Sequence, residues 1–231
     1  MRLILLLCLF ITAFSAIAVA STIRDEEHVC PLDGTKFSSM IVGSDTTFGS
    51  MLDLQPKGRA PYPWPVPKCP TDGFIMYKKF TEEELKLLKP YIKSKEYQKM
   101  QQIETNYYLL YKINEKLGTE DSILWYNLLQ ATWETREHYN RYAAETLSIL
   151  DRLLTNPKTD EKDKTVYFLI SGELYRRIGN FSKAKEVFDA LKKRPKPLDD
   201  DIDDGVYEAV IEYELLLIDE KNSTSQDMPN K

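Results

Sequence analysis

A pentapeptide that begins with cysteine occurs twice in the chain, as CPLDG at residues 30–34 and as CPTDG at residues 69–73. Each copy ends in Asp-Gly, which is typical of tight turns, because glycine adopts backbone angles that other residues avoid and aspartate bonds nearby backbone amides. We therefore expect Asp33 and Asp72 to close two similar turns. The state of the two cysteine sulfurs is the strongest constraint on how the N-terminal part of the chain folds.

Residues 1–20, MRLILLLCLFITAFSAIAVA, are typical of a secretory signal peptide. One arginine precedes the apolar stretch, and its Ala-Val-Ala ending fits the A-x-A pattern of a cleavage site. The alternative is an uncleaved anchor helix, since about 20 apolar residues can span a bilayer. Cleavage would remove Cys8 and leave Cys30 and Cys69 in a periplasmic or secreted chain, in a compartment where disulfides persist.

The mature chain is acidic. Removal of the signal takes away one of the 31 Lys+Arg residues and leaves 30 against 36 Asp+Glu. This balance disfavours nucleic acid and anionic lipid as partners. No later stretch is apolar enough for membrane insertion, so we expect a protein partner.

Residues 21–80 contain most of the glycines and many of the prolines, which predicts short strands and loops. The apolar runs SSMIV and FIMYKKF are the candidate strands. The segment PYPWPVPKCP at 61–70 has proline at nearly every second position, which excludes a helix. It predicts a stiff, extended connector between the two turns.

After residue 80 the sequence becomes helical in character. Thr81 followed by Glu84 is a capping box, which predicts a helix that begins at Glu82. Pro90 is expected to end or kink that helix.

Further helices are expected from apolar residues at helical spacing. We expect one over about 94–117, with Gly118 as its stop. The stretch 121–155 is long enough that it should fold back near 137–140 as two helices. A helix over about 205–217 is expected to close the array.

Residues 163–195 carry the most specific pattern of the helical part, DKTVYFLISGELYRRIGNFSKAKEVFDALKKRP. The pattern resembles a tetratricopeptide repeat, with Gly172, Tyr175, Gly179, Phe181, Ala184 and Phe188 at the family's spacing. The resemblance implies two antiparallel helices whose small residues, Gly172 and Ala184, lie at their closest approach. Tyr175 and Phe188 would fill the space beside them, and Gly179 would permit the tight turn. One repeat cannot bury its own face, so neighbouring helices are expected on both sides.

Two knuckles followed by tetratricopeptide-like helices also resemble a bacterial family of uncharacterised function, in which an N-terminal zinc ribbon has two C-P-x-C-G knuckles. Cys30 and Cys69 match the first cysteine of each knuckle, whereas Asp33 and Asp72 replace the second. The resemblance covers nearly the whole mature chain and implies a mainly α fold with a small N-terminal β and loop ribbon, without a known activity. The expected segments are a signal peptide at 1–20, a degenerate zinc-ribbon module at 21–80, a tetratricopeptide-like helical domain at 81–218 and a disordered tail at 219–231.

The resemblance places the sulfurs of Cys30 and Cys69 where two ligands of one zinc ion would meet, about 3.7 Å apart. A small inward shift would join them in a disulfide that replaces the metal as the staple of the ribbon. We therefore expect a disulfide and no cofactor. The alternatives are a mixed zinc site of Cys30, Asp33, Cys69 and Asp72, with or without His28, and a pair of free thiols.

The acidic run LDDDIDDG at 198–205 superficially suggests calcium. If Gly205 were the glycine that an EF-hand calcium loop requires, two ligand positions would fall on Ile202 and Ile211, which offer no side-chain oxygen. We expect the aspartates to cap the following helix instead.

The sequence offers no catalytic signature. The mature chain has two histidines, His28 and His138, and it lacks G-x-S-x-G, H-E-x-x-H, a P-loop and a glycine-rich dinucleotide loop. Carboxylates alternate with lysines, as on exposed helix faces. We therefore expect a protein that is not an enzyme.

The first functional hypothesis is an exported interaction or scaffold protein that binds a protein partner through the helical domain. Tyrosines on these helices would line its concave face or pack between helices, and they include Tyr107, Tyr108, Tyr111 and Tyr126. The alternative hypothesis is a zinc-binding or thiol-redox protein centred on the two knuckles.

Overall fold

The computed structural model describes residues 21–194 and 204–229. The predicted signal peptide at 1–20 and most of the acidic run at 198–205 lie outside the described residues. The described chain is mainly helical with a small β part near its N-terminal end, which confirms the predicted fold class. Among the described residues, no helix combines the length and the apolar composition that a membrane span requires.

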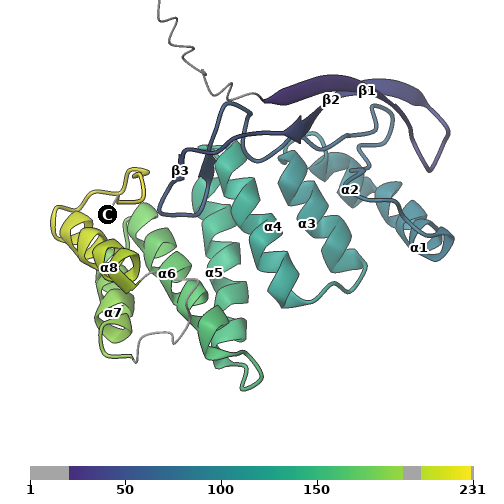
Figure 1. The fold of residues 1–231 in the computed structure, drawn as a ribbon. Coiled ribbons are helices and arrows are strands. Elements are labelled where there is room, and N and C mark those ends of the chain that lie inside the picture. The colour runs from purple at the N-terminus through teal and green to yellow at the C-terminus, as the bar shows by residue number, and fades with distance from the viewer. Residues whose placement is uncertain (1–20, 195–203, 230–231) are drawn as a thin grey trace, which may run out of the picture.

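Eight helices follow one another along the described chain, and each helix from α3 onward packs against the next (Figure 1). They are α1 Glu82–Ile92, α2 Lys95–Met100, α3 Asn106–Lys116, α4 Asp121–Glu134, α5 Tyr139–Thr155, α6 Glu161–Arg177, α7 Phe181–Leu191 and α8 Asp204–Asp219. The row of helices in Figure 1 is therefore an array of neighbours in sequence, as expected for stacked helical hairpins.

Polar side chains fix where the helices begin. The predicted capping box is present at α1, where Thr81 accepts from the Glu84 N–H and the Glu84 side chain accepts from the Thr81 N–H. In α2, α3, α6 and α7 the N-cap side chain alone accepts from a backbone N–H of the first turn, and these residues are Ser94, Thr105, Asp160 and Asn180. Each satisfies a backbone donor that the first turn of a helix leaves without a partner.

The helix predicted over 94–117 is in fact two helices, α2 and α3. Helix α2 ends at Met100 and α3 begins at Asn106, where the Thr105 side chain accepts from the Tyr108 N–H. Apolar residues continue at helical spacing through this break, which is why the pattern alone suggested one helix. The prediction for Gly118 is confirmed, since it has φ 74° and follows the last residues of α3.

Two further helix boundaries were predicted from the sequence. Pro90 lies inside α1, which continues to Ile92. The stretch 121–155 does fold back as two helices, α4 and α5, with the break at residues 135–138.

Two small antiparallel sheets make up the β part. The strands β1 Thr22–Val29 and β2 Lys36–Ser44 form a hairpin whose turn contains the first pentapeptide. The strands β3 Gly49–Ser50 and β4 Pro56–Lys57 form the second sheet. The run SSMIV lies in β2 as expected, whereas FIMYKKF forms no strand and contributes one isolated bridge, between Ile75 and Lys68.

The ribbon shares its core with the helices. Phe74 and Ile75, which follow the second pentapeptide, are fully buried in the same cluster as Leu88 and Ile92 of α1. The Tyr97 hydroxyl of α2 donates to the Gly73 carbonyl at 2.9 Å. The segment 21–80 is therefore seated on α1 and α2 by packing and hydrogen bonds.

The prediction of a disordered tail over 219–231 is wrong for the described residues. The Leu52 N–H donates to the Gln226 carbonyl at 3.0 Å, and the Met228 N–H donates to the Ser50 carbonyl at 2.9 Å. The tail thus adds to the edge of β3. Its polar composition gave no sign of these long-range backbone bonds.

The helices α6 and α7 form the hairpin predicted from residues 163–195. A Cβ atom on Gly172 would lie 2.5 Å from two ring atoms of Phe188, so only glycine permits this approach. Ala184 and Phe188 are fully buried, and Tyr175 and Phe181 pack against their cluster. Gly179 has φ 79° between the two helices. The hairpin is confirmed, whereas membership of the tetratricopeptide family stays a prediction.

The Gly172→Ala substitution is expected to destabilise the protein by about 1–3 kcal/mol, because overpacking at the helix contact outweighs the gain of about 1 kcal/mol in helix propensity. Urea denaturation of the mature protein measures the change. In a Phe188→Leu background the same substitution should cost much less, since the ring atoms that clash are absent. An equal cost in both backgrounds would contradict the packing that we describe.

Candidate functional site

The two pentapeptides fold into turns of the same kind. In each turn the glycine N–H donates to the cysteine carbonyl, at 2.9 Å for Gly34 and 2.9 Å for Gly73. The cysteine N–H donates to the carbonyl of Thr35 at 2.8 Å in the first turn and of Phe74 at 2.9 Å in the second. Both glycines have positive φ, 80° and 75°, so the glycine in each copy meets a backbone requirement.

Asp33 and Asp72 act as predicted, because each carboxylate accepts from the backbone N–H two residues later. The distances are 2.9 Å from Thr35 and 3.0 Å from Phe74. Asp33 also accepts from the Thr71 hydroxyl at 2.7 Å, which ties the first turn to the second and lowers the pKa of Asp33. Burial raises the pKa of Asp72.

Cys30 and Cys69 form a disulfide, with their Cα atoms 5.7 Å apart. Each cysteine is 1% exposed. The sulfurs are therefore bonded to each other rather than to zinc, and no group of three or more His, Cys, Asp or Glu among the described residues is placed to hold a metal. The ring of His28 packs against Phe37, with centroids 5.3 Å apart. Burial also keeps the disulfide away from external thiols, which does not favour a redox role.

Replacing both cysteines (Cys30→Ser with Cys69→Ser) is expected to lower the free energy of unfolding by about 4 kcal/mol. The reason is that the disulfide closes a loop of about 40 residues and so lowers the conformational entropy of the unfolded chain. Urea denaturation of the oxidised protein and of the double variant measures the difference. The wild-type protein unfolded and refolded in reductant is the control, and it should match the variant. Equal midpoints for oxidised and reduced wild-type protein would contradict the stapling role.

The tyrosines proposed for a concave binding face are mostly packed between helices. Tyr107, Tyr108 and Tyr111 are buried, as expected if they pack between helices rather than line a binding face. Tyr126 is partly exposed. The Tyr107 hydroxyl donates to the Trp64 carbonyl at 2.9 Å. These three tyrosines therefore belong to the core and offer no free surface for a partner.

A buried cluster of charges lies where α6, α8 and the tail meet. Arg176 is 0% exposed and donates to Glu214 of α8 at 2.7 Å and to Glu173 at 2.5 Å. Its third nitrogen donates to the carbonyls of Asn222 and Thr224, at 2.7 and 3.0 Å. Every nitrogen of the Arg176 guanidinium is thus occupied within the protein, and Arg176 serves to hold the tail.

The cluster contains more carboxyl groups than guanidinium groups, because Asp53 and Arg177 lie beside it. Burial and the neighbouring Glu173 raise the pKa of Glu214 to about 9. Glu173 contacts both arginines, at 2.5 Å for Arg176 and 3.6 Å for Arg177. We therefore assign the extra proton to Glu214, which brings the number of negative charges down to that of the guanidinium groups.

This assignment predicts how stability depends on pH. Between the ordinary pKa of glutamate and about 9, the folded state keeps a proton that the unfolded state loses. Stability from this group is therefore fully present below the ordinary pKa and is lost as the pH rises, by about 1.4 kcal/mol per pH unit. Glu214→Gln mimics the neutral acid and should remove this dependence, as measured by urea denaturation at pH 6, 7 and 8.

The matched control for this experiment is Glu212→Gln, on the exposed side of α8. The control should keep the wild-type dependence on pH. Parallel profiles for wild-type protein and Glu214→Gln would show that Glu214 is not the protonated group.

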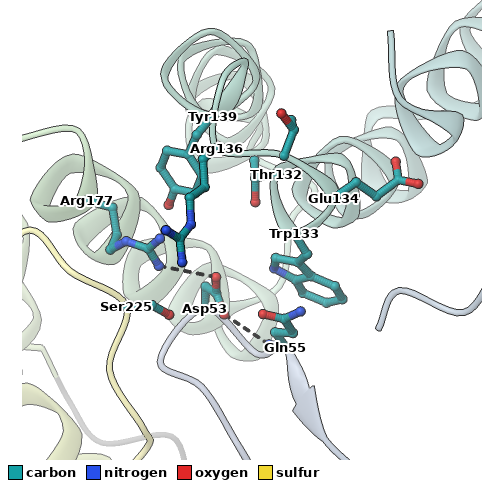
Figure 2. A pocket seen from close by; sticks show the side chains of 10 residues that line it. Asp53, Gln55, Thr132, Trp133, Glu134, Arg136, Tyr139, Arg177 and Ser225 are labelled. Atoms are coloured by element: carbon teal, nitrogen blue, oxygen red, sulfur yellow. Dashed lines mark hydrogen bonds and ion pairs between the residues drawn. The ribbon is translucent and has the colours of Figure 1, made fainter. Parts of the chain in front are cut away.

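Next to this cluster is a pocket of about 350 Å³ (Figure 2). It opens where the α4–α5 connection meets the end of α6, the loop after β3 and the C-terminal tail. The residues that matter most for its chemistry are Asp53, Trp133, Arg136, Tyr139, Arg177 and Ser225. Figure 2 shows Arg136 and Arg177 extending toward Asp53 from two different segments.

Three polar atoms in the wall of this pocket are buried and have no hydrogen-bond partner among the described residues. They are Trp133 Nε1, Tyr139 Oη and Arg177 Nη1. A buried donor without a partner costs about 1–3 kcal/mol, and such groups are rare in folded proteins. Their convergence on one pocket indicates a site that binds a ligand.

Asp53 and Arg177 face each other loosely across the pocket. Arg177 Nη1 is 3.6 Å from Asp53 Oδ2, which is too long for a hydrogen bond. Asp53 is bonded instead to the Gln55 N–H at 3.1 Å, and burial raises the pKa of Asp53. The Arg177 guanidinium lies 4.6 Å from the Tyr139 ring centroid, a cation–π contact that holds it in place. Arg177 therefore has hydrogen-bonding capacity to spare, in contrast to Arg176.

Sequence reasoning did not find this pocket. Its walls come from residues far apart in the chain, such as Asp53, Arg136 and Ser225, and no motif links them. The one available signal was the pair Arg176 and Arg177 at the C-terminal end of α6, because arginine is rarely buried unless it is paired.

No family model, no curated protein and no solved structure matches this chain. The resemblance to the bacterial two-knuckle family stays a prediction, and so do the signal peptide and the repeat assignment.

Proposed function

We propose that the chain is an exported, non-enzymatic protein that binds a protein partner at the pocket beside Asp53. The observation that carries the proposal is the set of buried donors in the pocket wall that lack a partner. Small-molecule sites are mostly apolar and enclose their ligand. This pocket has polar walls and accommodates one side chain or one chain terminus, so most of the binding energy would come from surrounding contacts with a larger partner.

The two histidines support a binding role over a catalytic one. His138 Nε2 lies 3.1 Å from the Ile103 carbonyl, and His28 packs against Phe37. Neither histidine lines the pocket. The helical array supplies the rigid frame, and the disulfide stabilises its N-terminal end against unfolding in an oxidising compartment.

A pull-down with the mature chain, residues 21–231, tests the proposal. Ser225 is exposed at the mouth of the pocket, so Ser225→Trp should fill the entrance without altering the core. Immobilised wild-type protein is expected to enrich a protein from an envelope extract, and Ser225→Trp is expected to lose it.

The matched control is Ser223→Trp, which puts the same side chain on an exposed tail position outside the pocket lining. It should retain the partner. Enrichment of nothing, or of the same proteins by all three baits, would contradict the proposal.

A further inference from the structure

We infer that the pocket binds a carboxylate group carried by the protein partner. The inference rests on the proposed binding function and names the chemical group that the partner brings. Its basis is the set of three groups without a partner, Trp133 Nε1, Tyr139 Oη and Arg177 Nη1. The Trp and Arg nitrogens can only donate, and the Tyr hydroxyl can donate. Glu173 Oε1 is a buried acceptor without a partner in the described part of the chain, but it lies 3.6 Å from Arg177 Nη1, too far for a hydrogen bond, so the three donors together still require an acceptor.

The charges of the pocket favour an anion as that acceptor. Arg136 is exposed, extends into the pocket and has no ion pair among the described residues (Figure 2). Arg177 has only two long ion pairs, each of 3.6 Å. Glu134 also lines the pocket, but its carboxylate points away from the two arginines and accepts from the Tyr107 N–H (Figure 2). With Glu214 protonated, Asp53 and Glu173 balance the charges of Arg176 and Arg177, so the charge of Arg136 is left for a ligand. A group with a single negative charge restores the balance.

The shape of the donors favours a carboxylate among anions. Guanidinium groups are planar and bind planar carboxylates through two parallel hydrogen bonds. The flat indole edge of Trp133 donates one further bond, and Tyr139 is 9% exposed, so its hydroxyl cannot turn to bulk water. Arg136, which is exposed, would close over a ligand that reaches these deeper donors.

Binding of small probes by the mature protein tests the inference. The chain has three tryptophans, and the indole ¹H–¹⁵N resonance of Trp133 can be assigned with Trp133→Phe. The probes are acetyl-dialanine with a free terminal carboxylate, N-acetyl-glutamate α-amide with a side-chain carboxylate, acetyl-dialanine amide and inorganic phosphate. We expect the two carboxylate probes to shift the Trp133 resonance and the neutral amide to leave it unchanged. The carboxylate probe that binds more tightly shows whether the partner supplies a terminal or a side-chain carboxylate.

Two variants probe the donors without threatening the fold. Arg136→Gln removes an exposed charge, and Tyr139→Phe removes one hydroxyl. Each should weaken carboxylate binding by about tenfold. Lys86→Gln, an exposed residue of α1 at the other end of the array, is the charge-matched control and should bind as the wild type does.

Several outcomes would overturn the inference: equal shifts with the neutral amide, a response to phosphate alone, or wild-type affinity in both pocket variants. If the pull-down finds a partner that Arg136→Gln still binds, the protein-binding function stands and the carboxylate site fails. If the probes bind as expected and no partner is captured, the site stands and the protein-binding function fails.

Discussion

The buried guanidinium of Arg176 is the interaction on which the C-terminal half of the structure depends. A buried charge is costly unless all its donors are paired, and Arg176 achieves this with carboxyl groups on α6 and α8 and with two carbonyls of the tail. Losing any of these segments would leave part of the buried guanidinium without hydrogen-bond partners. The tail is therefore held, and it places Ser225 at the pocket and pairs its backbone with residues 50–52.

The disulfide is a second anchor, and it holds the N-terminal segment 21–80 near α2. The disulfide joins the hairpin turn to the second pentapeptide, which is seated on α2 through Tyr97. Between this anchor and the tail, Leu52 packs with Val210 and Leu217 of α8. The segment 21–80 is thus fixed to both ends of the helical array, and Asp53 is held in the pocket by contacts on each side. Every guanidinium nitrogen of Arg176 donates a hydrogen bond, whereas Arg177, the next residue, has a buried nitrogen, Nη1, without a hydrogen-bond partner among the described residues.

The features that were predictable from the sequence are those whose cause is local. The capping box of Thr81 and Glu84, the stop at Gly118 and the Asp-Gly turns each depend on a few adjacent residues, and the structure contains them. The break between α2 and α3 was missed because apolar spacing continues through it. The order of the tail and the pocket beside Asp53 were missed for a different reason: both arise from contacts between residues more than a hundred positions apart, which composition and spacing do not record.

A crystal structure of mature protein grown in acetate would test the central claim most directly, because it would show the hydrogen bonds of Arg176 and Arg177 side by side. The account predicts an Arg176 bonded only to protein groups and an acetate bonded to Arg177, Trp133 and Tyr139. A structure in which these three side chains bond to other protein groups, with no ligand between Arg136 and Arg177, would contradict it.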